Sequence, residues 1–432
     1  DIPKRESPDE PVFNSLGYLQ HAQLTGSRAW VPGDPPQHTE GFGRVPEVAQ
    51  PTHAFGNSHA NPFVSRNLSA EDRTFVRERS GGDQKFNGYH TQMYDISFLL
   101  NTFFWDRFFV STIPQDSSID EDIFTTPLPN TRFSVDEDTN TLPSDLQDEF
   151  SSKHLSVDGA FNVNSTSVEA WAAILASMRN LPFNGEDNSP DGGAPNPFPR
   201  SLKQIGGSRN AETGIGENAF SGFRNLSDDQ IYDPDAQTGL AVEIVKQVRK
   251  RGPFLSLSHF VNRALVDSPS SPTETETEET LLGLKGALQS AIDDSGINGD
   301  FPAADVLEVP IHTHPWPSNP YADPHAASGQ ITTGIPGWLT QADMLQRLGP
   351  VLSPRSDTFV IRAYGQAGRF GSENLSRAWC EVTVRRTVDF LDPDKNSPED
   401  WPLNDATSGN LNSMFGRKYE IISFRWLSAS EI

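Results

Sequence analysis

The hydrophobic residues of the chain recur in two different patterns. Over 168–178 and 240–251 they return every three or four positions, which is the spacing of one face of a helix. Over 358–364, 377–388 and 419–426 they alternate with polar residues, which is the spacing of a strand with one buried face. The patterns therefore predict an α+β chain, with a helical domain in the middle and an antiparallel β-rich domain at the C-terminal end.

An aromatic segment before residue 110 carries a broader apolar stripe. Ile96, Leu99, Leu100 and Phe103 fall on helical spacing, and further phenylalanines widen the stripe. This pattern predicts a largely buried helix over 95–109. A strand is the alternative, because aromatic residues also favour sheets.

Three four-residue segments have the composition of a capping box, in which the first and fourth side chains bond to each other's backbone amides. They are Thr166–Glu169, Ser227–Gln230 and Thr340–Asp343. Each lies ahead of apolar residues at helical spacing, so each predicts a helix start. A further helix is predicted over 281–292.

Composition divides this loop-rich chain into sections. Its 432 residues suggest two or three domains, and its 33 glycines and 34 prolines indicate many turns. Residues 115–150 hold ten acids and one basic residue, Arg132, which indicates an exposed acidic connector. We expect a loop-rich N-terminal region with the aromatic helix over 1–114, the connector over 115–155, a helical domain over 156–305 and a β-rich domain over 306–432.

Charge and cysteine content narrow the function. With 34 basic and 58 acidic residues the net charge is −24. This charge argues against binding to nucleic acid, because contacts with phosphates are made by clustered Lys and Arg. It also argues against binding to an anionic membrane surface. A single cysteine excludes an internal disulfide framework. The chain contains no run of 18 apolar residues, so no transmembrane helix is predicted. Because the chain begins with Asp1 and not Met, we expect a processed or truncated chain.

Four residues form the best candidate metal site. His312 and His314 are two positions apart, so on a strand both imidazoles would point the same way, and Asp323 and His325 follow. The segment is broken by prolines, and paired histidines in loops are commonly solvated. A metal site here is therefore a hypothesis beside the simpler one of a solvated loop.

Calcium is the second metal for which the sequence contains a candidate site. Asp136, Asp138 and Asn140 alternate like the start of a calcium-binding loop, as do the residues of 392–396. Neither segment has the glycine and the glutamate that complete such a loop, so a solvated acidic loop is the simpler interpretation. No other cofactor is expected.

No catalytic constellation stands out in the sequence. The Gly-x-Ser-x-Gly elbow of many hydrolases is absent, and the glycine-rich segment 206–216 lacks the lysine of a phosphate-binding loop. Cys380 lies on the apolar side of a predicted strand, where we expect a buried, inert thiol. We therefore expect a non-enzymatic protein. A secreted calcium- or other metal-dependent binding protein or hydrolase is the alternative, because catalytic triads assemble in space and not in sequence.

The C-terminal section is where we expect a partner to bind. Residues 355–432 hold 10 basic and 11 acidic residues, so this section is nearly neutral within an acidic chain. Its strands would present edges for strand pairing, which is a common route to assembly. The residues expected to make contacts are Phe359, Ile361, Trp379, Phe424 and Trp426.

Eight blocks of the sequence resemble a bacterial protein family. They lie along nearly the whole chain, at Ser15–Ala22, Ala54–Pro62, Tyr94–Pro114, Gly159–Trp171, Arg251–Arg263, Leu339–Leu345, Ser356–Gly365 and Ala378–Val382. The family is the Verru_Chthon cassette protein A family, a paralogous family of verrucomicrobial genomes. The resemblance implies the large component of a gene cassette with pilin-like N-terminal leaders, and it implies no enzymatic chemistry.

A narrower resemblance points in the same direction. Phe161–Trp171 is similar to the entry to the helical domain of minor pseudopilin K of type II secretion, which lies at the tip of a short pilus-like assembly. The motif also occurs in helix-hairpin-helix DNA-binding proteins, but residues 181–185 replace their glycine hairpin here, and the flank is acidic. Together the resemblances imply a structural or interaction protein of the bacterial cell envelope or surface. It would be an ectodomain that assembles with pilin-like partners, or with itself, into a filament or a secretion-like assembly.

Overall fold

The structure of the chain is a computed structural model. It describes residues 13, 15–21, 55–62, 64–73, 91–113, 121–124, 128, 130, 132–135, 146–147, 151–157, 160–177, 196–200, 223–269, 274–299, 322–323, 325–327, 337–368, 376–396, 411–428 and 430–431. The chain divides into two compact units. Both helices and strands are present, so the predicted α+β class is confirmed.

The first unit is built mainly from helices, and it gathers residues 1–113, 126–134 and 157–354. Its α-helices are α1 (Ile96–Phe104), α2 (Val168–Ala176), α3 (Asp228–Ile231), α4 (Leu240–Arg251), α5 (Leu257–Val261), α6 (Glu278–Leu281), α7 (Ala287–Asp294) and α8 (Gln341–Leu348). The short 3-10 helices η1 (Leu16–His21), η6 (His325–Ala327) and η8 (Gly349–Val351) accompany them.

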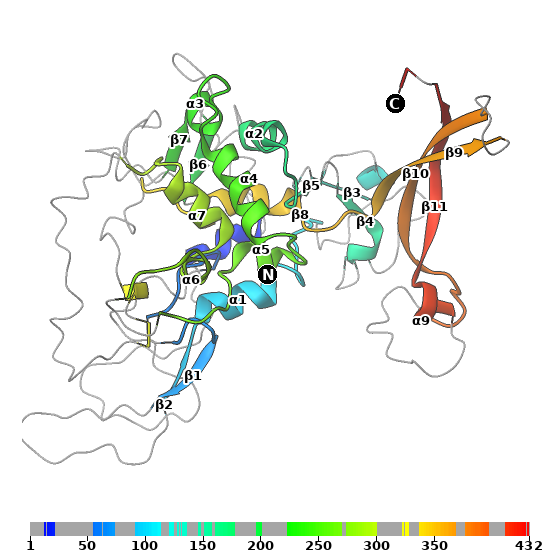
Figure 1. Ribbon diagram of the computed structural model, residues 1–432. Helices are drawn as coiled ribbons and strands as arrows, with labels where there is room; N and C mark the ends of the chain where they lie inside the picture. The colour runs from blue at the N-terminus through cyan, green and yellow to red at the C-terminus, as the bar shows by residue number, and fades with distance from the viewer. Residues whose placement is uncertain are drawn as a thin grey trace, which may run out of the picture. The chain divides into compact units, whose positions relative to one another are not determined.

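Helix α4 lies at the centre of the core of the first unit. It packs against α2 and α7, and α7 in turn contacts α5 and α8 (Figure 1). Leu240, Ile244, Val245 and Val248 form its buried face. Its last turn is basic, which suits the negative end of the helix dipole. The apolar stripe predicted for 240–251 is therefore confirmed.

Four of the sheets that the described residues form have two strands each. β1 (Ala70–Arg73) pairs antiparallel with β2 (Thr91–Tyr94), and β6 (Asn196–Pro199) pairs antiparallel with β7 (Phe223–Leu226). β5 (Phe161–Asn162) pairs parallel with β8 (Leu352–Ser353), and β3 (Phe133–Val135) is next to β4 (Leu155–Val157).

Two of the three predicted capping boxes are confirmed. Those at 227–230 and 340–343 make both reciprocal bonds, at the starts of α3 and α8. The third is wrong by one residue, because the hydroxyl that reaches a free amide is that of Ser167, which accepts from the backbone amide of Ala170 at 3.1 Å. Glu169 then accepts a hydrogen bond from the Ser167 hydroxyl at 3.0 Å.

The single helix predicted over 281–292 is wrong. The structure has two helices, α6 and α7, with Gly283 and Gly286 between them. Gly286 approaches its surroundings so closely that a Cβ there would overlap the carbonyl oxygen of Val261. Glycine is needed at this close approach, and its low helix propensity favours a break in the helix.

The helix predicted over 95–109 is α1, but the expectation that it is largely buried is wrong. Leu99 is 37% exposed and Phe103 is 46% exposed, whereas the polar residues Ser97 and Asn101 are buried. The reason is that Oδ1 and Nδ2 of the Asn101 side chain each make two hydrogen bonds within the first unit. It therefore holds the inward position that the apolar pattern assigned to its neighbours.

The second unit gathers residues 114–125, 135–156 and 355–432. Its main element is a three-stranded antiparallel sheet of β9 (Thr358–Ala367), β10 (Ser376–Phe390) and β11 (Arg417–Leu427), with β10 in the centre (Figure 1). η2 (Glu121–Phe124), η3 (Ser151–His154) and α9 (Leu411–Phe415) are further elements of this unit. All three strands predicted for the C-terminal section are confirmed.

The pairing of β10 is continuous on one side and interrupted on the other. It pairs with β9 without a break from Ser376 to Arg385. Its pairing with β11 shifts between Thr383 and Val384, which leaves Ile422 as an extra residue in β11. Such a β-bulge bends the strand that carries it.

The limits of the two units differ from the predicted domain limits. α8 lies in the first unit, although the predicted limit at 306 groups it with the C-terminal strands. The elements η1 and α1 from the first 114 residues belong to the same unit. The physical reason is direct packing, since α8 contacts η1, β6 and α7.

Candidate functional site

The three-stranded sheet has two chemically different faces. Residues opposite each other in paired strands point to the same face, and successive residues point to opposite faces. Val382 lies between Ile361 of β9 and Phe424 of β11, so these three side chains share one face. We call this surface the apolar face. Its members are Phe359, Ile361, Ala363, Ala378, Cys380, Val382, Val384, Tyr419, Ile421, Phe424 and Trp426.

The large side chains of the apolar face are open to solvent. Ile361 is 49% exposed, Phe424 53%, Trp426 69% and Ile421 70%. Rings also contact one another on this face, since the centroids of Phe424 and Trp426 are 5.3 Å apart. Large contiguous apolar patches are rare on soluble monomers and mark surfaces that bind other molecules. The apolar face is therefore the strongest candidate interaction surface on the second unit.

The opposite face of the sheet carries ion-paired side chains in addition to Val360, Tyr364 and Trp379. Glu381 of the central strand accepts hydrogen bonds from Nε of Arg362 at 2.7 Å and from Nε of Arg425 at 2.8 Å, so it joins all three strands. These hydrogen bonds, that from Arg362 first, hold the pKa of Glu381 below its usual value. Arg385 and Glu420 form a further pair at 3.4 Å. This face is suited to contact with water.

Four of the five predicted contact residues share the apolar face: Phe359, Ile361, Phe424 and Trp426. Trp379 lies on the opposite face, where its ring centroid is 5.4 Å from that of Tyr364. The alternation along β10 separates them, because Trp379 and Cys380 are neighbours in the sequence.

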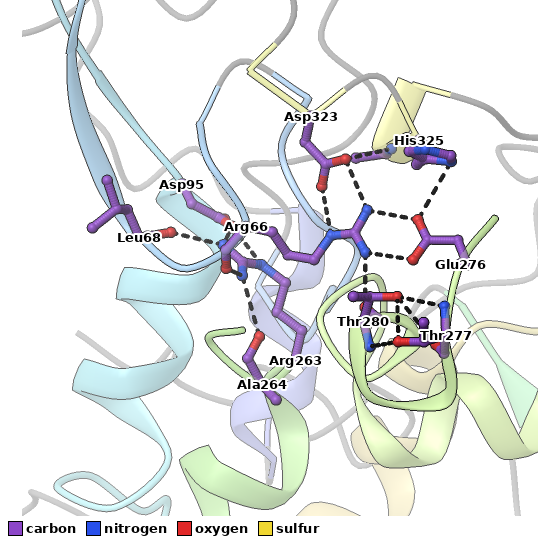
Figure 2. A network of polar contacts seen from close by, with 11 residues as sticks. Arg66, Leu68, Asp95, Arg263, Ala264, Glu276, Thr277, Thr280, Asp323 and His325 are labelled. Atoms are coloured by element: carbon purple, nitrogen blue, oxygen red, sulfur yellow. Dashed lines mark hydrogen bonds and ion pairs between the residues drawn. The ribbon is translucent and has the colours of Figure 1, made fainter. Parts of the chain in front are cut away.

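In the first unit, a fully buried arginine joins three distant segments (Figure 2). Nε and Nη2 of Arg66 donate to the two carboxylate oxygens of Asp323, at 2.8 Å each. Nη1 and Nη2 donate to the two oxygens of Glu276, at 2.9 Å each. Nη1 also donates to the backbone carbonyl of Thr280 at 2.7 Å. All five N–H donors of the guanidinium are therefore used.

Ion pairing explains how this cluster tolerates burial. Burial by itself lowers the pKa of Arg66, but its hydrogen bonds with Asp323 and Glu276 outweigh burial, so the pKa is raised. Burial acts to raise the pKa of Glu276, and the hydrogen bonds with Arg66 and Thr280, together with nearby positive charge, outweigh burial, so that pKa is lowered. His325 Nδ1 lies 3.4 Å from Oε1 of Glu276 (Figure 2). The guanidinium has no donor left for a ligand, so the cluster's chemistry is structural.

A second buried ion pair lies beside the first (Figure 2). Nη2 of Arg263 donates to Oδ2 of Asp95 at 3.0 Å and to the carbonyl of Leu68 at 2.9 Å, and Nη1 donates to the carbonyl of Arg66. Asp95 also caps α1, where it accepts from the amide of Phe98 at 3.0 Å. Burial raises the pKa of Asp95, and Arg263 opposes that rise. The two clusters together fix the start of α1 to the segment around Arg66.

The residues of the predicted metal sites are placed only in part. Asp323 has both carboxylate oxygens bonded to Arg66, and His325 lies beside Glu276. The others lie outside the described residues: His312, His314, Asp136, Asp138 and Asn140. Within the described ranges, no three His, Cys, Asp or Glu side chains are grouped so as to hold a metal ion. The metal site and the calcium site stay predictions.

Sequence reasoning missed Arg66 and Glu276 as members of the cluster that holds Asp323. Arg66 is 257 positions from Asp323 and 210 positions from Glu276, and no short motif surrounds Arg66 or Glu276. Only the fold brings the three segments together. A local signal existed for Asp95 alone, since an aspartate directly before an apolar stripe is typical of a helix start.

Comparison with known proteins gives no match to this chain, whether among protein-family models, curated proteins or solved structures. The family resemblance therefore stays a prediction. Among the helices of the described residues, none has the length and apolar character needed to cross a membrane.

Proposed function

We propose that this protein is a non-enzymatic structural or interaction protein of the bacterial cell envelope or surface. It assembles with pilin-like partners or with itself through the apolar face of β9, β10 and β11. The single observation that carries the proposal is the exposure of that face, on which large side chains such as Trp426 and Ile421 contact solvent.

A sheet with one apolar face needs a second layer. Domains consist of packed layers, and an apolar sheet face is normally covered by helices or by another sheet. The exposed fractions indicate that the described residues do not supply that layer. A partner molecule that covers the face would remove a large apolar surface from water.

The edges of the same sheet support assembly as well. Within the described part of this sheet, β9 and β11 each pair only with β10, so both are edge strands. β11 has the bulge at Ile422 and the charged residues Arg417 and Lys418, which are common ways to discourage pairing at an edge. β9 pairs without a bulge and carries one charged residue, Arg362, which makes it the more open edge.

The envelope location and the pilin-like partner come from the resemblance of the sequence blocks. Both are tested by expressing the tagged chain in a bacterium that encodes it, separating envelope from soluble fractions, and isolating the chain under mild detergent. Mass spectrometry then identifies pilin-like proteins among those retained. Electron microscopy of the same preparation tests for filaments or other ordered assemblies.

A matched pair of variants ties the result to the apolar face. Trp426→Ser removes a 69% exposed ring from this face, and Tyr364→Ser removes a 54% exposed ring from the opposite face. The proposal expects retention of pilin-like proteins, or assembly, for the unmodified chain and for Tyr364→Ser, and loss for Trp426→Ser. A chain found only in the soluble fraction as a monomer without such proteins would contradict it.

A further inference from the structure

We infer that the apolar face is covered by a second copy of this chain, with the two sheets packed face to face about a two-fold axis. This inference rests on the proposed function and names the partner at the proposed surface.

The area of the face is close to what a stable dimer needs. Its six large exposed residues are Phe359, Ile361, Tyr419, Ile421, Phe424 and Trp426. Taking about 150–250 Å² for an aromatic side chain, their exposed fractions amount to roughly 600 Å² of mostly apolar surface. A standard protein interface takes about 800 Å² from each partner. Apposed faces and their rims would therefore form an interface of ordinary size.

The face that would meet its own copy is either uncharged or internally ion-paired. Identical copies carry identical charges, so a self-pairing surface must be neutral or internally paired. From Ala378 to Val384 along β10, no member of the apolar face is charged. Arg386, further along on this side, is bonded to Asp357, with Nε donating to Oδ1 at 2.8 Å. In a chain with a net charge of −24, this neutral surface is where two copies can approach each other.

The sizes of the side chains fit a two-fold axis that runs along β10. Such an axis sets β9 of one copy against β11 of the other, and in a two-fold interface each contact occurs twice. Trp426 is level with Ala363 across the sheet, through Cys380. Trp426 of each copy then lies over the small residues Ala363 and Gly365 of the other. A Cβ placed on Gly365 would meet no atom within 4 Å, so space is open there.

The same geometry places Cys380 at the centre of the interface. Cys380 lies on the central strand between Ala363 and Trp426, and it is the one cysteine of the chain. It is partly exposed, so the expectation of a buried thiol is wrong. Stacked sheets lie about 10 Å apart. The thiol is therefore a built-in reporter of whether the face is open or covered, because a maleimide reaches it only when the face is open.

The test combines sedimentation velocity over a range of concentrations with the rate of maleimide labelling of Cys380, on the whole chain. Ile361→Ser and Val360→Ser are the matched variants, since these neighbours on β9 are 49% and 61% exposed and point to opposite faces. Circular dichroism and thermal melting establish that both variants fold. Phe424→Ser is a second variant on the apolar face, for use if Ile361→Ser does not fold.

We expect dimers in the unmodified chain and in Val360→Ser, with labelling that slows in proportion to the dimer fraction. Ile361→Ser is expected to remain monomeric and to be labelled at one rate at all concentrations. Three results would overturn the inference: a monomer at every concentration, a dimer whose Cys380 is labelled as fast as in the monomer, or equal weakening by both variants. A monomer that still retains pilin-like proteins would overturn self-pairing alone and leave the proposed function standing.

Discussion

Arg66 and Asp323 form a buried, bidentate ion pair across 257 positions of the chain, with both N···O distances at 2.8 Å and both side chains closed to solvent. The pair is completed by Glu276, which occupies the remaining side of the guanidinium. Three segments of the first unit are therefore fixed by one side chain.

Arg66→Met is expected to destabilise the first unit by about 3–5 kcal/mol, because it leaves two carboxylates without their counter-charge. Urea unfolding followed by fluorescence measures the change. Lys246→Gln is the control, since Lys246 forms an exposed pair with Glu243 at 2.8 Å and its loss should leave the midpoint nearly unchanged. The triple variant Arg66→Met, Glu276→Gln, Asp323→Asn should recover part of the loss. Equal midpoints for Arg66→Met and the control would refute the role given to the cluster.

Asn101→Leu is expected to cost at least about 3 kcal/mol, because the buried amide makes four hydrogen bonds and leucine makes none. Its Oδ1 accepts from the amide of Gly56 at 2.8 Å and from Nε1 of Trp105 at 3.2 Å. Its Nδ2 donates to the carbonyl of Asn57 at 2.8 Å and to Oδ1 of Asn262 at 3.0 Å.

The control for Asn101→Leu is Ser177→Ala, which removes one exposed hydroxyl that bonds its own helix end. Thermal unfolding of the two variants should separate them clearly. If the leucine variant were as stable as the alanine variant, Asn101 would not be the anchor that keeps α1 in its orientation.

Gly17→Ala is expected to destabilise the first unit by about 1–3 kcal/mol, because an added methyl has no space. A Cβ at Gly17 would overlap the backbone of Leu345 and Gln346, where η1 packs directly on α8. Ser177→Ala is the control, since it removes one exposed hydroxyl and adds no atom. Denaturant midpoints for both variants decide the matter, and a neutral effect at Gly17 would show that η1 can move away from α8.

His59 makes the first unit less stable in mild acid. Burial, and then the positive charge of Lys285, lower its pKa to about 4, with Asp293 opposing. The unfolded chain has an ordinary histidine pKa of about 6.5, so between these values the unfolded state binds the extra proton. Stability is therefore complete above pH 6.5 and falls as the pH drops toward 4, by up to about 3 kcal/mol.

His59→Asn should remove this part of the pH dependence and flatten the stability curve between pH 4 and 6.5. His259 is a useful control, because burial lowers its pKa as well but it lies in a more exposed position at α5. Chemical unfolding at several pH values measures each slope. The assignment to His59 fails if His59→Asn keeps the slope of the unmodified chain.

Local patterns were enough for much of the fold. The stripe over 240–251 and the alternation over 377–388 each report burial on one side of an element, and both elements formed as predicted. Capping residues marked helix starts at Ser227 and Thr340, because a cap involves only four neighbouring residues.

Other features depend on contacts that a local pattern does not contain. The inward position of Asn101 on α1 depends on Asn262, 161 positions away, and the break before α7 depends on the close approach of Gly286 to Val261. The candidate contact residues of the sheet were likewise predictable only in part. Alternation placed Phe359, Ile361, Phe424 and Trp426 on strands, but only the register of three strands assigns them to one face and Trp379 to the other.

The contact between η1 and α8 cannot form until most of the chain has been synthesised. The hydroxyl of Ser15 donates to the carbonyl of Leu345 at 3.2 Å, across 330 positions. At about 5–20 residues per second, a ribosome needs roughly 15–70 s to make the chain between them. For that time the emerging η1 segment has no α8 to pack against. Chaperones and competing molecules have the same interval in which to reach it.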